Sequence, residues 1–291
     1  MKTGDDLARR FDVVPVKPAS PLVFAVAHAG RDLMGIDRDQ LQADDATIRS
    51  LEDPLVDQLV VGDCRLDAAL LINRAARAVV DVNRDPVEID PRLIEGGSGR
   101  ETPRTRAGLG VVPRLGGDGK ALYRGRLAAA EIQERITKLH LPYHAALAEL
   151  MRGAHSAFGY AVLVDWHSMP SAAAKAEQAR GGVRPHIVIG DRFGRSAAPQ
   201  VSGVVRAAFE GAGRRVLMNR PFAGGYTTQT WGRPDEGFHA IQIEIDRSLY
   251  LDETTVQPGP GFAALVRDIS SVARALHGAL ESKKAAPESA A

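Results

Sequence analysis

Apolar positions along the chain form short runs, separated by longer stretches with helical spacing. The short runs are rich in Val, Ile and Leu, which indicates buried strands. They are LVFAVAHAG at 22–30, ARAVVDV at 76–82, AVLVDWHS at 161–168, HIVIGD at 186–191, RRVLMN at 214–219 and FHAIQIEIDRSLYL at 238–251. The last run alternates strictly, so it places Gln242 and Glu244 on one face and isoleucines on the other.

Four stretches carry the apolar stripe of an amphipathic helix. Residues 128–159 give the strongest pattern, and Pro142 is expected to kink or split that helix. Residues 201–213 and 261–280 predict two more helices. Residues 53–60 predict a fourth, with Asp53 as its N-cap and Pro54 in the first helical position.

The remaining segments predict loops and tails. Residues 171–185 and 221–237 are small, polar or glycine-rich, and residues 87–126 form a long stretch rich in Gly, Pro and Arg. Residues 1–20 are expected to be a polar lead-in and residues 281–291 a disordered tail. The alternation of strands and helices between them predicts a single α/β domain over 21–280, with helices on both faces of a mixed sheet.

Composition narrows the class of protein. With 44% apolar and 25% charged residues, the 291-residue chain is typical of a soluble globular protein that can bury a core. A net charge of +1 gives no electrostatic footprint for nucleic acid or an anionic membrane. No apolar run approaches the roughly 20 residues of a membrane span, and the N-terminus lacks the pattern of a signal peptide. A cytoplasmic location is the resulting expectation.

Cysteine usage restricts the kinds of site that are available. The one cysteine, Cys64, excludes an intrachain disulfide and any multi-cysteine metal site, and is most simply a small packing residue. The arginines of 84–126 have no interleaved aromatic residues, which favours a solvated loop over a surface that stacks on bases. Because the chain has a single cysteine, any bound metal must use histidine, carboxylate and water as ligands.

Polar residues stand at the ends of several predicted strands, where α/β sheets usually bind ligands. His28 follows the first strand, Asn83 and Arg84 follow the second, and His167 closes the third. Two histidines and a carboxylate form a natural catalytic zinc set. The simpler alternatives are that the histidines occupy turns, that Asp165 satisfies backbone donors, and that Arg84 forms a surface ion pair with Asp85.

The carboxylate of such a set is open on sequence grounds. Asp53 and Asp57 lie one helical turn apart on the same predicted face, and either could complete it. Asp57 could equally be a plain exposed helix residue. Glu244 lies either on a solvated strand face or in the interior as a functional acid. The chain has no HExxH helix, so it is not a metalloprotease of that kind.

A series of motifs in a fixed order resembles the N-formylglutamate amidohydrolase family, related to the zinc carboxypeptidases and aspartoacylases. The motifs are HAG (28–30), EDPLVDQL (52–59), ARAVVDVNRDP (76–86), PYH (142–144), VDWHSMP (164–170), IGDRFG (189–194), NRPFAGGY (219–226) and HAIQIEIDRSLYLDE (239–253). They span roughly residues 22–253. The resemblance implies a three-layer α/β/α sandwich around a mixed, mainly parallel sheet, of the phosphorylase/hydrolase-like and zinc-carboxypeptidase-like type.

The resemblance also implies a metal centre with one Zn²⁺. His28 and His167 would be zinc ligands, and HS at 167–168 is similar to the third-ligand motif of zinc carboxypeptidases. Those enzymes take a histidine and a glutamate from one HxxE motif, but here Arg31 stands at the glutamate position. The EDPLVD segment is then the expected carboxylate donor. Asp57 is preferred because Asp53 already serves as a predicted helix cap, with Asp53 as the alternative.

The remaining roles concern the substrate. Asn83 and Arg84 resemble the pair that binds the substrate carboxylate in carboxypeptidase-like enzymes, a task that suits the planar guanidinium of arginine. Arg77 resembles the arginine that polarises the scissile carbonyl, and Glu244 resembles the general base. The glycines of PFAGGY would let that loop approach the substrate. Three further residues are expected to line the pocket: Arg220, Tyr226 and His144.

These roles predict a zinc-dependent amidohydrolase acting on a small N-acyl amino acid with a free carboxylate. N-formyl-L-glutamate is the first expectation, with formate and glutamate as products in histidine degradation. The alternatives are a zinc carboxypeptidase or peptidoglycan-type amidase on the same scaffold, and a non-catalytic protein that binds small carboxylates. Neither nucleic acid nor membrane is an expected partner, and the sequence leaves the oligomeric state open.

Overall fold

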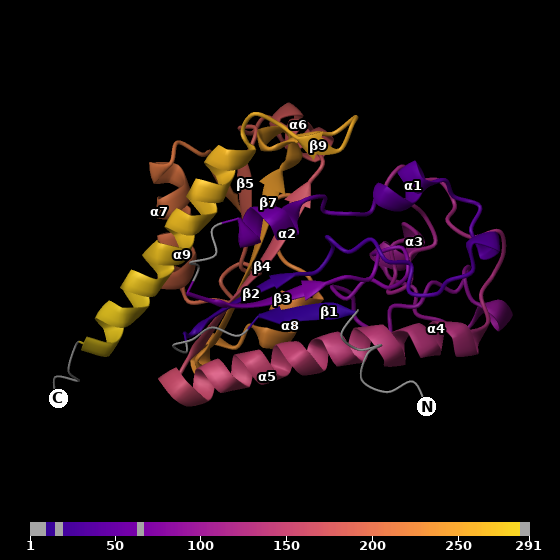
Figure 1. Cartoon of the computed structure of the whole chain (residues 1–291), viewed down its shortest axis with the longest axis horizontal. Helices are drawn as coiled ribbons and strands as arrows, with labels where there is room; N and C mark the ends of the chain where they lie inside the picture. The colour runs from indigo at the N-terminus through magenta and orange to yellow at the C-terminus, as the bar shows by residue number, and fades with distance from the viewer. Residues whose placement is uncertain (1–9, 15–19, 63–66, 286–291) are drawn as a thin grey trace.

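A computed structural model describes residues 10–14, 20–62 and 67–285, and its centre is a seven-stranded sheet (Figure 1). The strand order is β1-β3-β2-β4-β7-β5-β6. The β1–β3 and β5–β7 pairs are antiparallel and the other four pairs are parallel, as expected for a mixed, mainly parallel sheet. The strands are β1 (Phe11–Val14), β2 (Leu22–Val26), β3 (Ala69–Asn73), β4 (Ala161–Met169), β5 (Ile187–Gly190), β6 (Val216–Met218) and β7 (Phe238–Asp246).

Helices cover both faces of the sheet, which confirms the three-layer α/β/α architecture (Figure 1). One face packs against α4 (Ala129–Arg135) and α5 (Leu141–Phe158) through side chains such as Leu147 and Met151. The other face packs against α2 (Val56–Val61), α7 (Pro199–Gly211) and α9 (Phe262–Ala285). Trp166 of β4 is fully buried on this second face and meets Phe24 edge-on, with ring centroids 5.5 Å apart.

The shorter elements lie in the connections. The helical ones are η1 (Arg38–Gln40), α1 (Asp45–Arg49), η2 (Glu95–Gly97), α3 (Pro103–Arg106), α6 (Ser171–Ala179), α8 (Tyr226–Trp231), η4 (Pro234–Glu236) and η5 (Arg247–Leu249). A small hairpin joins β8 (Leu251–Asp252) to β9 (Gln257–Pro258). Residues 87–126 contain little regular structure, as expected, but they bury side chains such as Val111 and Leu122 in the main core.

Two predictions at the N-terminal side of the sheet are wrong, one of a strand and one of a polar lead-in. The strand lies at Ala69–Asn73, whereas residues 76–82 run through turns that are buried among the loops. Buried turns are apolar because of their burial, so composition alone does not distinguish them from a strand. The expected lead-in also contains β1, which pairs with β3. Cys64 lies outside the described residues.

Two predicted loops contain helices. Residues Ser171–Ala179 form α6, since five alanines give this polar stretch a strong intrinsic helix propensity. Residues Tyr226–Trp231 form α8 within the glycine-rich segment 221–237.

The helix predicted over 128–159 is continuous, because a π-helical turn, Ile136–His140, joins α4 to α5. Pro142 lies in the first turn of α5, where a proline is tolerated, rather than at a break.

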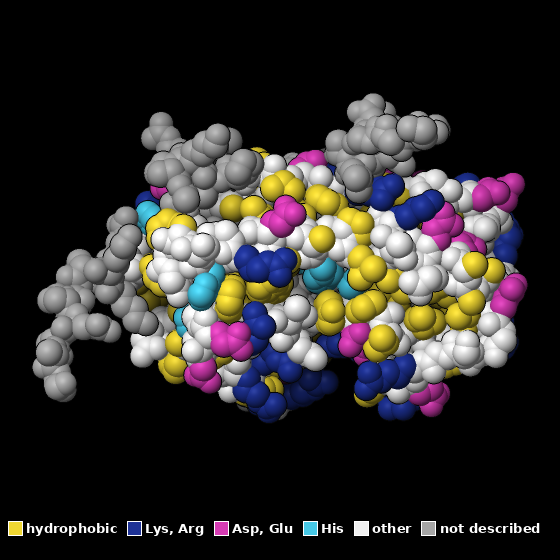
Figure 2. Space-filling model, turned by 90° about the horizontal axis from the view of Figure 1, so that it is seen from below, with side chains coloured by type: hydrophobic (Ala, Val, Ile, Leu, Met, Phe, Trp, Pro, Cys, Tyr) yellow, Lys and Arg dark blue, Asp and Glu magenta, His cyan; other side chains and the backbone are white. Residues whose placement is uncertain are grey.

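Side chains of both charges lie on one face of the molecule. On the face that lies beneath the sheet, basic and acidic side chains are mixed with apolar ones (Figure 2). Among the described residues, no helix combines the length and apolar character that a bilayer crossing requires.

Candidate metal centre

Three segments that are distant in the sequence meet at the carboxyl ends of β2 and β4. These strands are parallel neighbours, with Ala25 of β2 opposite Asp165 of β4. His28 lies two residues beyond β2, and His167 projects from β4 itself. Asp53 lies in the loop before α2, and its backbone N–H donates to the carbonyl of His28 at 2.9 Å. The sheet therefore brings two imidazoles and one carboxylate to a single point.

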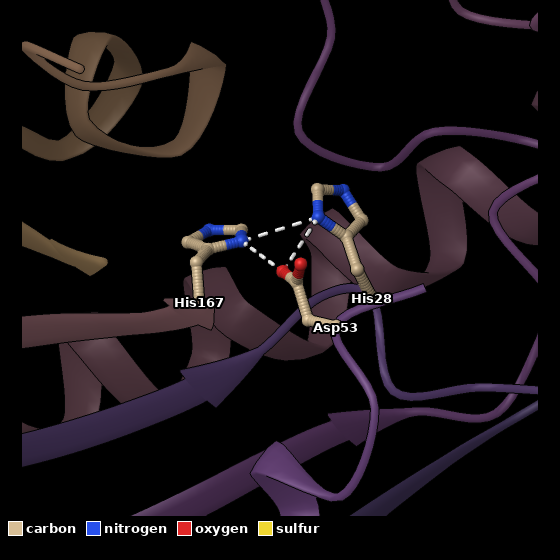
Figure 3. Close-up of side chains that lie close together, drawn as sticks. All are labelled: His28, Asp53 and His167. Carbon is tan, nitrogen blue, oxygen red and sulfur yellow. Dashed lines mark hydrogen bonds and ion pairs between the residues drawn. The ribbon is translucent and has the colours of Figure 1, made fainter. Parts of the chain in front are cut away.

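The three side chains form a tight triangle (Figure 3). The Nδ1 atoms of His28 and His167 are 3.1 Å apart, and Asp53 Oδ2 lies 3.2 Å from the first and 2.8 Å from the second. Zinc bonds of about 2.0–2.2 Å in a tetrahedron need ligand atoms about 3.3–3.6 Å apart, so the observed spacing is within about half an ångström of a zinc face. All three residues are buried. The donor set and its spacing fit a metal ion.

The second nitrogen of each histidine faces a buried carboxylate. His28 Nε2 lies 2.7 Å from Asp81 Oδ1, and His167 Nε2 lies 3.0 Å from Asp165 Oδ2. Neither oxygen of Asp165 has a hydrogen bond of good geometry within the described residues, so its contact with His167 Nε2 is an ion pair that a proton on this nitrogen strengthens. A proton on each Nε2 leaves both Nδ1 lone pairs directed at the centre, as metal-ligating histidines require.

The charged groups at the centre shift the pKa values of one another. Burial opposes ionisation of Asp53, but hydrogen bonds from His167 and His28 outweigh it and hold the pKa of Asp53 well below its usual range. Burial likewise opposes a charge on His167, yet Asp165 and Asp53 raise its pKa well above the ordinary value. A metal ion at this point would replace the proton on His167 Nδ1, since metal ligands must be deprotonated.

The preference for Asp57 as the carboxylate ligand needs correction. Asp57 Oδ2 accepts a hydrogen bond from Arg74 Nη1 at 2.9 Å, outside the group of His28, Asp53 and His167. The helix begins later than predicted, because Leu55 adopts a left-handed conformation (φ 61°) and α2 starts at Val56. Asp53 therefore does not cap the helix with its side chain, which is directed to the two histidines instead.

Glu244 lies beside this centre. It is opposite His167 in the parallel β4–β7 register, and the alternation of β7 places it on the same face as Gln242. The face is not solvated, since Glu244 is only 8% exposed. Burial raises the pKa of Glu244 to about 7, and its Oε1 accepts a hydrogen bond from Gln242 Nε2 at 2.8 Å. This is a carboxyl group that can exchange a proton near neutral pH.

The centre opens into a cavity of about 490 Å³ that is lined by His28, Asp53, His167, Glu244 and three of the predicted substrate residues, Arg77, Asn83 and Arg84. Arg77 lies 2.8 Å from Asp81 Oδ2. Arg84 donates to the carbonyls of Leu109 and Asn83, and its burial lowers its pKa to about 10, so it stays charged at neutral pH.

Asn83 is engaged inside the protein. Its Oδ1 accepts the Thr227 N–H at 2.9 Å, while its Nδ2 contacts His167 Nε2 and Gln242 Oε1 at 3.1 and 3.4 Å. A Cβ atom on Gly225 would lie 2.4 Å from Asn83 Oδ1, so this glycine is needed for the loop to approach Asn83. Of the predicted pair, the structure leaves Arg84 as the better placed to contact a ligand.

Three predicted pocket residues lie outside the lining of this cavity. The side chain of Arg220 is 71% exposed and faces Glu177. Tyr226 packs against the rings of His140 and His144, and His144 Nε2 donates to the carbonyl of Val82 at 2.7 Å. His144 and Tyr226 thus support the turn of Asn83 and Arg84 from outside the cavity. A larger hollow of about 680 Å³ beside α4 contains none of the predicted site residues.

Residues 20–251 match the profile of a protein family described as N-formylglutamate amidohydrolase, and this span contains the whole cavity lining. The chain belongs to the N-formylglutamate amidohydrolase family. Membership makes it an amidohydrolase.

Individual relatives agree with this. An N-formylglutamate deformylase of Pseudomonas aeruginosa is 31% identical over 191 residues, which cover 65% of this chain and 66% of the relative. One of Pseudomonas putida is 29% identical over 239 residues, which cover 80% and 83%. The crystal structure of N-formylglutamate amidohydrolase from Ralstonia eutropha JMP134 superimposes with a TM-score of 0.86 at 29% identity, covering 94% of this chain and 99% of that one. A protein from Agrobacterium tumefaciens, 20% identical with a TM-score of 0.62, shares the fold.

Sequence reasoning assigned no functional role to four residues around this centre. Asp81 and Asp165 face the histidines, and Gln242 and Arg247 complete the wall of the cavity. Asp165 carried a usable signal, because it lies two positions before His167 in the same strand, which places both side chains on one face. Arg247 carried none, since it contacts Asp53 across 194 positions. The contact of Asp81 with His28 spans 53 positions, although Asp81 also contacts its sequence neighbours Arg77 and Asn83.

Proposed function

We propose that this protein hydrolyses the amide bond of N-formyl-L-glutamate and releases formate and glutamate. The observation that carries the proposal is the triangle of His28, Asp53 and His167 in a cavity that also holds the titratable Glu244 and the cation Arg84. The names of the relatives supply the substrate, since two of them are N-formylglutamate deformylases.

His28, Asp53 and His167 would hold one Zn²⁺, with Asp53 as the carboxylate ligand. The ion would supply Lewis acidity, which polarises an amide carbonyl and lowers the pKa of water. Asp81 and Asp165 would orient the two imidazoles and keep their Nδ1 atoms unprotonated.

Glu244 serves as the general base and then as the general acid in this proposal. Burial raises the pKa of Glu244, which favours its return of a proton, while a cation at the triangle would favour the ionised form that accepts one. It takes a proton from the attacking water and returns it to the departing amine nitrogen of glutamate. Its place opposite His167 in the sheet register keeps it beside the metal ligands.

Arg84 binds a substrate carboxylate, which fixes the position of the formyl group relative to the metal centre. Asn83 supports it through the turn that both residues share. Arg77 lies on the same wall of the cavity and stabilises negative charge on the carbonyl oxygen as the bond breaks. The Asp81 carboxylate forms an ion pair with Arg77 and accepts a hydrogen bond from the Asn83 N–H, so it fixes both residues on this side of the cavity.

A combined measurement of metal content and hydrolysis tests the proposal. Purified protein should contain close to one zinc per chain, and a chelator should abolish hydrolysis of N-formyl-L-glutamate, which added zinc restores. Full activity after complete metal removal would refute the metal centre. Hydrolysis of a C-terminal peptide bond or a peptidoglycan amide, with N-formylglutamate left intact, would refute the substrate. Zinc-loaded protein that hydrolyses none of these would point to a carboxylate-binding protein.

A further inference from the structure

Arg247 links the segments that carry two of the metal-ligand candidates. It follows β7 and is only 9% exposed. Its Nε donates to Ser168 Oγ at 3.1 Å, next to His167 in β4. Its Nη2 donates to the Glu52 carbonyl and, at 3.2 Å, to Asp53 Oδ1. One guanidinium therefore spans β4 and the loop that presents Asp53.

These contacts give the two carboxylate oxygens of Asp53 different partners. Oδ2 faces both histidines, at 3.2 and 2.8 Å, whereas Oδ1 faces Arg247. A carboxylate can bind a metal through one oxygen or through both. Because a charged donor holds Oδ1, only Oδ2 is directed at the point where His28 and His167 converge.

We propose that Arg247 is a positioning residue that keeps Asp53 a one-oxygen ligand of the metal. The inference rests on the proposed function, since it requires a metal at the triangle. A catalytic zinc site takes three protein ligands and keeps a further position open for water or substrate. Without Arg247, Oδ1 can turn towards the ion and occupy that position, so the chemical step is slowed although the ion is still bound.

Other contacts hold the loop in place when Arg247 is changed. The Asp53 N–H donates to the His28 carbonyl, and Tyr250 Oη donates to the Pro54 carbonyl at 2.7 Å. The substitution therefore acts on the orientation of the carboxylate more than on the path of the chain. Arg184 offers a matched control, because it pairs with the buried Asp246 at 2.7 Å at the end of the same strand but does not line the cavity.

The experiment compares Arg247→Met, Arg247→Lys and Arg184→Met with the unchanged protein, each loaded with Zn²⁺ for kinetics and with Co²⁺ for visible spectroscopy. For Arg247→Met we expect kcat to fall about 10–100-fold, KM to change less than about threefold, and metal content to stay near one ion per chain. The Co²⁺ absorption should weaken, as it does when a four-coordinate ion gains an oxygen ligand. Arg247→Lys should recover part of kcat and of the absorption, because it restores a charge near Oδ1. Arg184→Met should leave both unchanged.

Other results would overturn the inference. A rise in KM of more than about tenfold with an unchanged spectrum would make Arg247 a substrate-binding residue instead. An unchanged kcat and spectrum in Arg247→Met would show that Arg247 does not position Asp53. An equal effect of Arg184→Met would show that Arg247 contributes only to the stability of the fold. If the Met variant does not fold, Arg247→Gln is measured in its place. An unchanged protein that binds no metal would refute the proposed function before any variant is compared.

Discussion

Replacing Asp81 with Asn removes the charge of a carboxylate that four groups share, one of them Arg84, whose Nε lies 3.6 Å from Oδ2. Asp81 Oδ1 accepts from His28 Nε2 at 2.7 Å and from the Asn83 N–H at 2.9 Å, and Oδ2 accepts from Arg77 at 2.8 Å. The amide keeps Oδ1 as an acceptor for the first two groups. Its NH2 group would face Arg77, so two donors would meet where an ion pair stood.

The size of the effect follows from burial. The side chain of Asp81 is 1% exposed and that of Arg77 is 17% exposed, so water does not replace the lost partner. Removing one member of a buried ion pair costs about 3–5 kcal/mol, a large part of the total stability of about 5–15 kcal/mol of a typical protein. Loss of a carboxylate behind a ligating histidine weakens metal binding about 10–100-fold.

Two measurements separate these effects. Urea unfolding of the metal-free protein at pH 7 gives the free energy of unfolding, and competition with a chelator gives the zinc affinity. Asp90→Asn is the control, because Asp90 is fully buried against Arg92 and Arg114 but lies outside the cavity. We expect both variants to lose stability and only Asp81→Asn to lose zinc affinity. Zinc affinity of Asp81→Asn within about twofold of the unchanged protein would contradict the assigned role of Asp81.

Three further predictions concern other groups. Glu244→Gln should reduce kcat at least about 100-fold while zinc content stays at one ion, and near-normal turnover would exclude Glu244 as the base. Arg84→Ala should raise KM for N-formyl-L-glutamate at least about tenfold, which kinetics on that substrate would show, and an unaltered KM would assign the carboxylate to another cation. Burial lowers the pKa of His144 to about 4 from 6.5. As the pH falls, His144 is therefore protonated in the unfolded chain at a higher pH than in the folded protein. The free energy of unfolding should therefore drop by about 2 kcal/mol between pH 7 and pH 5 through this group, and a urea series in which His144→Gln shows the same drop would refute the assignment.

The sequence by itself determined the features that repeat locally or follow a fixed order. Alternation in β7 placed Gln242 and Glu244 on one face, and the structure has them there. The order of motifs identified the family and, through it, the three-layer fold. The periodicity of a strand or helix is a property of neighbouring residues, so the chain reveals it without its tertiary context.

The intrinsic helix propensity of alanine predicts one helix that the apolar periodicity does not show. The alanine-rich stretch that forms α6 had the composition of a helix, but its polar character suggested a loop. The turns at 76–82 had the composition of a strand because they are buried. In the first place polarity was taken as the sign of a loop, and in the second apolar composition was taken as the sign of a strand.

The tertiary structure alone decided which carboxylate meets the histidines. The sequence offered both Asp53 and Asp57 and favoured Asp57. The structure separates them, because α2 begins only after the left-handed Leu55 and Arg74 binds Asp57. His28 and His167 are 139 positions apart, and Arg247 contacts Asp53 across 194 positions. Contacts at such separations depend on strand order and register, which arise from packing the whole sheet, so no local pattern encodes them.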